Sequence, residues 1–371
     1  MLSSESEVIE ARTRQDTEKF ILFPFDLYRN DPLYSPELLR DQRPYFSPQN
    51  PFFNHADVKL FIARDRGKTI GRVVSIVNHL HNERCGDKTG FFGFFESIRD
   101  SRTASLLMDR VADELRKAGM NRMRGPMDFS TNEQCGFLID GFDYPPMIMT
   151  PYNPDYYPRL VEEYGMVKSK DLLAFIKEIP EGLPDKIERV ARLAERRNIR
   201  TRKVSKKNLL KDMQVFQEIY NESWSENWGF IPLQDDELTF LAGRLKDVMV
   251  PDLTLIAEKN GIPVGFLGLL PDYNGLLRKM MGRLNPLTIF KAFMGYRKIK
   301  DLRLLLLGIR PSYRNMGVDA VMLSKAFRYI KGRFERAEFS WILEDNVAVI
   351  RLVEMVGGRA YKRYRIYEKE L

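Results

Sequence analysis

The sequence predicts an α/β protein built on a mixed sheet, and three observations support that class. First, the apolar run 304–307 is short enough for a strand buried on both faces, and a helical pattern follows it after a turn containing Gly317. Second, the runs 59–63 and 70–77 flank a glycine-containing turn and predict an antiparallel hairpin. Third, this order of strands and helices occurs twice along the chain.

Composition limits the class of protein. The 371 residues suffice for two cores, and a hydrophobic content of 44% excludes global disorder. The formal net charge of +8 favours anionic ligands. Cys85 and Cys135 are too few for a disulfide framework. The polar, acidic start is unlike a secretory signal, and no apolar run approaches about 18 residues. We therefore expect a cytoplasmic protein without a transmembrane segment.

Hydrophobic periodicity and turn residues divide the first half into elements. Gly119 and Gly165 each end a helical pattern, because glycine readily adopts the left-handed conformation that follows a helix. The expected order is a short strand, a helix and an aromatic segment within 1–56, the hairpin, a strand at 90–95, a helix at 105–118, a strand at 120–123, a loop at 125–146, a helix at 153–164 and a strand at 171–176.

The second half repeats strands and helices around an insertion. Pro311 ends the central strand, because proline lacks the N–H that a ladder needs. The expected order is a basic connecting helix at 185–198, a strand at 199–204, helices at 209–224 and 235–248, a hairpin of 253–258 and 264–270, an insert at 271–301, the central strand with its helix, a strand at 338–343, a helix at 347–355 and an edge strand at 359–369.

Short residue matches accompany the repeated order. The two halves share the pattern Asn, Leu-Val-Glu, Gly, with spacings that differ by one residue: Asn153, 160–162 and Gly165 match Asn346, 352–354 and Gly357. We therefore predict two copies of one α/β fold, an N-terminal domain over 1–180 and a C-terminal domain over 181–371.

The turn after the central strand resembles a known motif. Arg314-x-x-Gly317-x-Asp319 is similar to the acyl-CoA pyrophosphate loop of the GNAT acyltransferase superfamily, although that family has glycine or alanine where Asp319 stands. Three segments resemble a bacterial tandem-GNAT group: 90–96, 129–133 and 152–157. The resemblance covers nearly the whole chain from about residue 57 onward and implies two tandem GNAT-like domains.

The resemblance implies acetyl-CoA or a longer acyl-CoA as the acyl donor. Free backbone N–H groups of a splayed central strand would bind the thioester oxygen, and the basic loop would hold the pyrophosphate at a helix N-terminus. The implied cofactor-binding residues are Leu307, Gly308, Ile309, Arg314, Asn315, Met316, Gly317, Val318 and Asn346. Asn346 could equally cap the following helix. The corresponding segment 97–103 has no glycine, so we expect no cofactor in the first domain.

The sequence offers few candidates for the catalytic acid and base. Many GNAT enzymes have a tyrosine acid in the penultimate helix where this chain has Val353, so Tyr361 and Tyr364 of the last strand become the candidate acids. Glu344 ends the preceding strand and could deprotonate an amine, or could be a solvated turn carboxylate.

The candidate substrate residues lie in loops, which carry function more often than cores do. Trp224 and Trp228 predict an apolar wall of the acceptor pocket, unless both belong to the core. The first domain adds Asn132, Glu133 and Tyr152. The basic, amphipathic insert 276–300 could cover a long apolar acceptor, rest on anionic lipid, or pack against its own protein.

The expected function is N-acyl transfer from acyl-CoA to a primary amine, by direct attack in the C-terminal domain. One alternative is a lipid-amine acyltransferase that uses acyl-CoA or acyl carrier protein. Another is a FemAB-like or non-catalytic tandem-GNAT protein. His79, His81 and Cys85 are expected at a hairpin end and lack an evident fourth ligand, so we expect no metal. The basic run 192–207 is mostly helical linker, so we expect no nucleic-acid partner.

Overall fold

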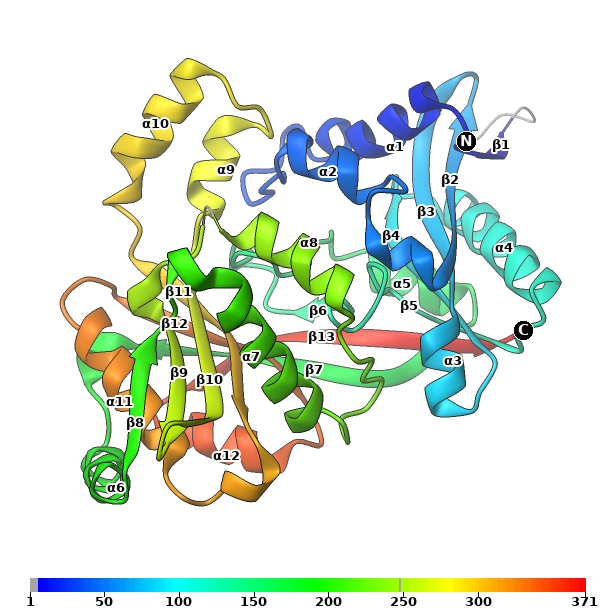
Figure 1. Ribbon diagram of the computed structural model, residues 1–371. Coiled ribbons are helices and arrows are strands. Elements are labelled where there is room, and N and C mark those ends of the chain that lie inside the picture. The colour runs from blue at the N-terminus through cyan, green and yellow to red at the C-terminus, as the bar shows by residue number, and fades with distance from the viewer. Residues whose placement is uncertain (1–5, 247) are drawn as a thin grey trace. The chain divides into compact units, whose positions relative to one another are not determined.

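Figure 1 shows the computed structural model of the chain, which describes residues 6–246 and 248–371, the side chains of 291–293 excepted. Residues 1–5 and 247 lie outside the described residues. Residue 247 falls near the expected end of the helix at 235–248.

The chain forms two compact units. The first contains Met1–Leu172, Asn274–Ala292 and Lys362–Leu371, and the second contains Leu173–Tyr273 and Phe293–Tyr361. Each unit is therefore discontinuous in sequence.

The first unit is built on a mostly antiparallel set of strands. Its members are β1 (Glu7–Glu10), β2 (Ala56–Asp65), β3 (Lys68–Asn78), β4 (Thr89–Ser97), β5 (Arg122–Gly125), β6 (Phe137–Asp140), the start of β7 (Val167–Glu178) and the end of β13 (Arg359–Glu370). Neighbours pair in the order β1–β2–β3–β4, and β5 joins β4 in parallel. The C-terminal end of β13 pairs antiparallel with β5 and with β6.

Helices cover the strands of the first unit. They are α1 (Arg14–Leu27), α2 (Leu39–Tyr45), α3 (His79–Cys85), α4 (Ser101–Lys117), α5 (Tyr157–Glu163) and α9 (Asn274–Met280), with a 3-10 turn at Pro51–Asn54. Leu107 and Val111 of α4 are fully buried and lie in one core with Phe61 and Phe92. The apolar positions of α4 recur at helical spacing, so one face packs on the sheet and the other meets solvent.

The second unit has the same kind of sheet. Its strands are β8 (Ile199–Lys203), β9 (Thr254–Lys259), β10 (Ile262–Pro271), β11 (Asp301–Ile309) and β12 (Arg336–Leu343), with the end of β7. Strands β8 to β11 are antiparallel neighbours in chain order, and β12 lies parallel to β11. Its helices are α6 (Asp185–Arg196), α7 (Leu209–Ser223), α8 (Asp235–Leu245), α11 (Val318–Ile330) and α12 (Val347–Met355).

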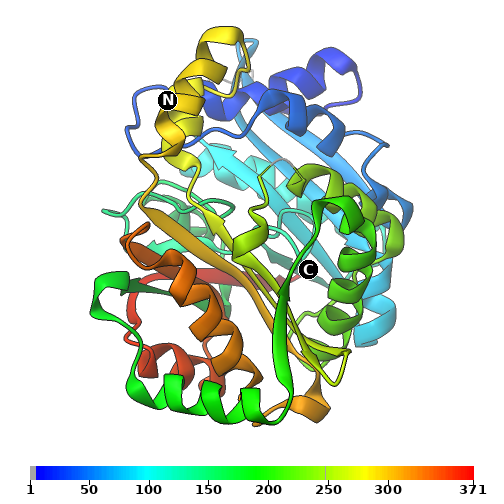
Figure 2. The ribbon, with the colours of Figure 1, turned by 60° about the vertical axis from the view of Figure 1, so that its left-hand side comes forward.

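Two separate cores lie on the two faces of this second sheet. Ala191 of α6 and Val321 of α11 pack with the strands on one face. Met213 and Phe216 of α7 pack with Phe266 and neighbouring strand residues on the other. Figure 2 shows α6 and α11 on one side of these strands and α7 on the other. Short 3-10 turns lie at Ile179–Glu181, Lys206–Asn208, Pro251–Leu253 and Pro311–Tyr313, and α10 (Pro286–Tyr296) follows α9 in the insert.

Most expected elements are confirmed within a few residues, and three expectations were wrong. The region 125–146 contains β6 rather than loop alone. The last strand is not an edge strand, because β13 lies between β5 and β7 in the sheet and β6 pairs with it as well. Residues 79–85 form the helix α3 instead of a hairpin end, and Asn78 caps that helix by accepting a bond from the His81 N–H. The pairing of β6 and β13 joins strands that are distant in sequence, and the start of α3 depends on a cap. Neither feature produces a periodic pattern of apolar residues.

Removing the cap of α4 should destabilise the first unit. The Asp100 carboxylate accepts hydrogen bonds from the Thr103 N–H at 2.7 Å and the Thr103 hydroxyl at 2.8 Å. We expect Asp100→Ala to lower the free energy of unfolding by about 1 kcal/mol, measured by urea denaturation. Asp113→Ala, on the exposed face of the same helix, serves as the control and should cost less than about 0.5 kcal/mol. Equal losses in both variants would contradict the cap.

Candidate functional site

The central strand of the second unit leaves its parallel neighbour partway along. β11 pairs with β12 only over Asp301–Leu304, whereas its pairing with β10 continues to Ile309. Alternate N–H groups of Leu305–Ile309 therefore face the side that β12 has left, since strand N–H groups point alternately to either side. In the described part of the chain, these N–H groups have no partner from β12 on that side.

A buried ion pair holds the two strands together just before they part. Arg303 and Glu338 are register partners, are almost fully buried, and lie 3.6 Å apart between Nε and Oε1. Arg303 also donates to the Ser340 hydroxyl at 2.9 Å, and its guanidinium lies over the Trp341 ring. Removing either member of such a pair leaves an uncompensated buried charge, so the pair fixes where the gap begins.

Trp224 lies directly against the separated end of β11. A Cβ added to Gly308 would come within 2.4 Å of the Trp224 ring, so only glycine leaves room for that ring. The ring also stacks on Tyr220 with centroids 4.8 Å apart. Trp228 is half-buried in the loop that follows. The structure thus brings one predicted substrate residue onto one predicted donor-binding residue.

The turn after β11 has the backbone of an anion-binding loop. Asn315 and Gly317, on either side of Met316, have φ of 62° and 81°, and turns of this kind can direct backbone N–H groups toward one point. Gly317 also packs on α6, where an added Cβ would lie 2.9 Å from the Val190 side chain. Arg314 is exposed and donates to the Ser223 carbonyl at 2.8 Å. Both the conformation and the packing therefore require glycine at 317.

Helix α11 begins at this turn without a side-chain cap. Gly317 occupies the capping position, so no side chain accepts from the first N–H groups. These groups and the helix dipole favour an anion there. Lys259, on β9, lies close by with its ammonium 3.6 Å from the Met316 sulfur. Asp319 is half-buried in the first turn. The residues present fit a phosphate group, and Asp319 carries a charge that opposes it.

The candidate catalytic residues lie in different units and differ in their burial. Tyr361 belongs to the second unit and donates its hydroxyl to the buried Glu338. Tyr364 belongs to the first unit, where it is fully buried. Glu344 is half-buried directly after β12. Asn346 accepts a bond from the Val349 N–H at 3.3 Å and so caps α12. The capping alternative for Asn346 is therefore what the structure shows.

The predicted substrate residues of the first domain lie in ordered loops of the first unit. Asn132 and Glu133 are half-buried and donate backbone N–H bonds to Ser130. Tyr152 donates to Asp31 at 2.5 Å, and burial together with this bond raises the pKa of its hydroxyl. These contacts fix the loops, and a role in binding substrate stays a prediction.

The first unit contains the same departure of strands, but its own residues occupy the gap. β4 pairs with β5 only over Thr89–Phe91. Beyond this point the Phe92 carbonyl accepts from the Met127 N–H at 2.8 Å, and the Asp128 carboxylate accepts from the Phe94 N–H at 2.7 Å. A Cβ on Gly93 would lie 1.9 Å from the Met127 carbonyl oxygen. The backbone of this gap is therefore satisfied internally.

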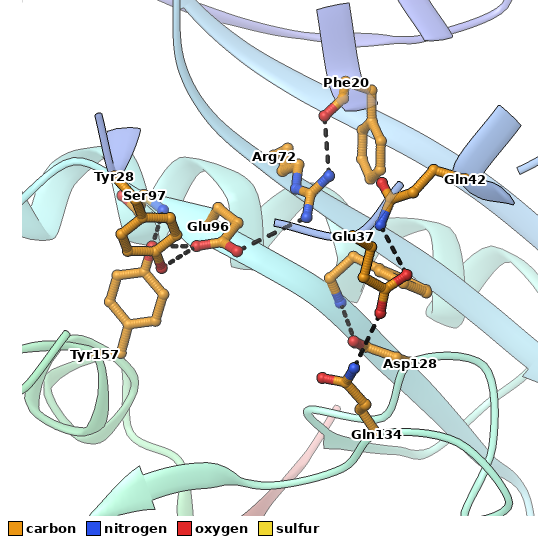
Figure 3. A network of polar contacts seen from close by, with 11 residues as sticks. Phe20, Tyr28, Glu37, Gln42, Arg72, Glu96, Ser97, Asp128, Gln134 and Tyr157 are labelled. Carbon is orange, nitrogen blue, oxygen red and sulfur yellow. Dashed lines mark hydrogen bonds and ion pairs between the residues drawn. The ribbon is translucent and has the colours of Figure 1, made fainter. Parts of the chain in front are cut away.

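A buried acidic network, which the sequence reasoning did not identify, lies next to that gap (Figure 3). Glu96 accepts from the hydroxyls of Tyr28 at 2.5 Å and Tyr157 at 2.7 Å, and Arg72 lies 3.7 Å from its other oxygen. Burial raises the pKa of Glu96 although the Arg72 charge opposes the shift. The charged residue ending the run 90–96 of aromatic residues was the available sequence signal.

Asp128, in the same region, has a strongly perturbed carboxyl. Burial raises its pKa to about 7, although the bond from the Phe94 N–H works in the opposite direction. Phe94 and Phe129, on either side of this contact, have positive φ of 50° and 78°. Such strained residues persist only where the surroundings hold them. The Asp128–Phe94 bond is the contact that connects the two strained segments.

Comparisons with known proteins agree with the resemblance to GNAT acyltransferases. A model of the Acetyltransferase (GNAT) family matches residues 213–357. Over the whole chain, the protein is 31% identical to "Bacterial ceramide synthase" of Caulobacter vibrioides, of which 98% is covered. It is 30% identical to "Protein YghO" of Escherichia coli, of which 97% is covered.

Solved structures show the same fold at low identity. A tandem GNAT protein from the clavulanic acid biosynthesis pathway covers 99% of this chain, with 98% of its own length matched, a TM-score of 0.58 and 10% identity. A GCN5-related N-acetyltransferase from Sphaerobacter thermophilus covers the whole chain, with 97% of its length matched, a TM-score of 0.54 and 13% identity. The predicted mixed α/β, tandem-GNAT fold is confirmed.

Asp128 should make the stability of the first unit depend on pH. A folded pKa above the unfolded value favours the protonated acid in the folded state, so this stability is complete below the unfolded pKa and is lost as pH rises through about 7. We expect Asp128→Asn to gain about 1–3 kcal/mol relative to wild type between pH 5 and pH 8, measured by urea denaturation. Asp143→Asn, at an exposed position, is the control and should show no such gain.

Proposed function

We propose, because this chain belongs to the GNAT acetyltransferase family, that its second unit transfers an acyl group from acyl-CoA to a primary amine. The observation that carries the proposal is the end of the β11–β12 ladder at Leu304, which frees the N–H groups of Leu305–Ile309 on one side. The turn at Arg314–Gly317 and the uncapped start of α11 follow directly in sequence. This combination provides one place for a thioester and another for a pyrophosphate.

Backbone donors in this gap would act on the charge that develops during transfer. When the amine nitrogen attacks the thioester carbonyl carbon, a C–N bond forms and the carbonyl oxygen becomes negative. The Leu307 or Ile309 N–H, both on the open side of β11, would stabilise that oxygen, and one such donor contributes about 10²–10³ in rate. The C–S bond then breaks, and the thiolate takes up a proton as the amide forms.

Proton transfer is assigned to residues at the ends of β12 and β13. The amine must lose a proton to attack, and Glu344 is the proposed base because it ends β12 beside the cap of α12. Tyr361 is the proposed acid from the second unit, and its bond to Glu338 must open before it can donate elsewhere. Val353 of α12, which stands where many GNAT enzymes have a tyrosine acid, has no ionisable group that could donate this proton.

We further propose one acyl-CoA per chain, held by the second unit. In the first unit Asp100 caps α4 and Asp128 binds the freed Phe94 N–H. Two carboxylates thus take the donors that a pyrophosphate and a thioester oxygen would require. Met316 and Val318 of the second unit complete the proposed pyrophosphate loop, together with Arg314, Asn315 and Gly317.

A long-chain lipid amine is the second candidate acceptor. It is favoured by the full-length similarity to a protein named as a bacterial ceramide synthase, since a ceramide contains an amide of a long-chain amine. Trp224, stacked on Tyr220 and set against Gly308, would provide an apolar wall for such a chain. The acyl donor is acyl-CoA, and acyl carrier protein is the alternative carrier.

Mass spectrometry of the amide products tests both acceptors. The protein is incubated with acetyl-CoA or palmitoyl-CoA and with short or long amines, and the amide that forms identifies the acceptor.

Binding of acetyl-CoA or palmitoyl-CoA should stabilise the protein at one site per chain. We expect Arg314→Glu to weaken binding about tenfold, because it removes a cation beside the loop and adds a negative charge, measured by calorimetry with stoichiometry. Arg102→Glu, exposed in the first turn of α4, is the matched control in the first unit and should leave affinity unchanged. Two binding sites per chain would contradict the proposed stoichiometry. A loss of affinity in Arg102→Glu but not in Arg314→Glu would mean that the first unit binds the acyl-CoA.

Asp319 should oppose the bound pyrophosphate. We expect Asp319→Ala to tighten CoA binding about two- to fivefold, because a charge in the first turn of a helix has an effect of this size. The same calorimetric titration at low and high salt measures the change. Asp345→Ala, an exposed carboxylate outside this turn, is the control. A gain of a hundredfold or more would mean that the native loop is not a working pyrophosphate site.

A further inference from the structure

Helix α10 exposes apolar side chains that the described chain does not cover. Leu287, Ile289, Phe290 and Met294 are each more than half exposed. Leu287, Phe290 and Met294 share one face, because residues three and seven positions apart align on a helix. None of the other described elements makes extensive contact with α10. Large apolar residues clustered in this way mark an interaction surface more often than an ordinary surface.

The helix is built by local interactions that do not use this face. The Asn285 side chain accepts from the Thr288 N–H at 2.9 Å, and the Thr288 hydroxyl accepts from the Asn285 N–H at 2.8 Å. Pro286 occupies the first helical position, where its missing N–H costs nothing. A reciprocal cap of this kind sets the start of the helix. The apolar face is therefore available to a partner without disturbing the cap.

Positive charge surrounds the apolar face. The segment 274–300 contains no Asp or Glu and seven basic residues, while the whole chain has a formal net charge of only +8: Arg278, Lys279, Arg283, Lys291, Arg297, Lys298 and Lys300. Lys279 and Arg283 precede the helix, Arg297 and Lys298 follow it, and all four are exposed. An apolar helix with basic residues at both ends matches a surface with an apolar interior and anionic headgroups.

We propose that α10 docks on the surface of an anionic phospholipid bilayer, with Leu287, Phe290 and Met294 among the acyl chains and the flanking bases at the phosphates. At about 1.5 Å per residue, Pro286–Tyr296 is too short to cross a hydrocarbon core of about 30 Å, so it lies in the interface. Among the described residues no helix has the length and apolar character to span a bilayer.

Two other occupants fit these features less well. A second copy of the chain would bring two segments of the same strong positive charge together, and like charges oppose that contact. An acidic protein such as an acyl carrier protein would match the bases but would leave the exposed Leu287, Phe290 and Met294 without an apolar partner. A bilayer with anionic headgroups satisfies both the charge and the apolar face. This inference is independent of the proposed acyl transfer.

Vesicle cosedimentation tests the proposal with the full chain. We expect binding to vesicles of phosphatidylcholine and phosphatidylglycerol in equal parts, little binding to phosphatidylcholine alone, and weakening by salt. Arg297→Glu with Lys298→Glu should reduce the partition constant by at least about 30-fold, since each basic residue near the surface contributes about fivefold. Phe290→Asp should reduce it at least about tenfold, because it removes an exposed aromatic ring that the bilayer would bury and adds a charge.

The matched control is Leu210→Asp, which places the same charge at an exposed leucine of α7 and should leave vesicle binding unchanged. Thermal melting should be unchanged in Phe290→Asp, because its side chain is exposed. Equal binding to both kinds of vesicle, or none to either, would overturn the proposal. A dimer that Phe290→Asp dissociates, or binding only to an acidic carrier protein, would also overturn it and identify the partner instead.

Discussion

The structure depends most on the point at which two parallel strands stop pairing. In the second unit that point is Leu304, and in the first it is Phe91. Backbone N–H groups on the open side of each strand need partners, because an unpaired buried donor costs as much as a lost hydrogen bond. Each unit must therefore either fill the gap with its own chain or leave it for a ligand. The identity of the residues around the gap decides between these outcomes.

The two units meet this requirement in different ways. In the first, Met127 and Asp128 come back across β4, and Gly93 is the residue that allows so close an approach. In the second, an aromatic ring lies against Gly308, and the next helix starts on Gly317 without a capping side chain. The two copies of one fold therefore differ in chemistry. The first unit satisfies the donors of its gap with its own residues, whereas the second unit is the one proposed to bind an anion.

Burial explains why the acids of the first unit persist. Glu96 is shared by two tyrosine hydroxyls and faces Arg72, so its lone pairs are satisfied in the interior. Asp128 accepts from one backbone N–H and has a pKa of about 7, so its protonation changes near neutral pH. A polar network of this kind is stable only when its members are satisfied. The gap, which both units share, is therefore filled by ionisable groups in this unit.

Sequence periodicity determined most of the fold, because apolar residues at spacings of two and 3.6 report local burial. It located the hairpins, the central strand Leu304–Ile309 and the Gly317 turn, and the family resemblance then gave roles to these residues. It could not place β6 or the pairing of β13, because those depend on strands distant in sequence. Nor could it show that Asn346 caps α12 or that Asp128 binds Phe94. Such contacts are set by tertiary packing, which alone brings a carboxylate from one loop to an N–H on another strand.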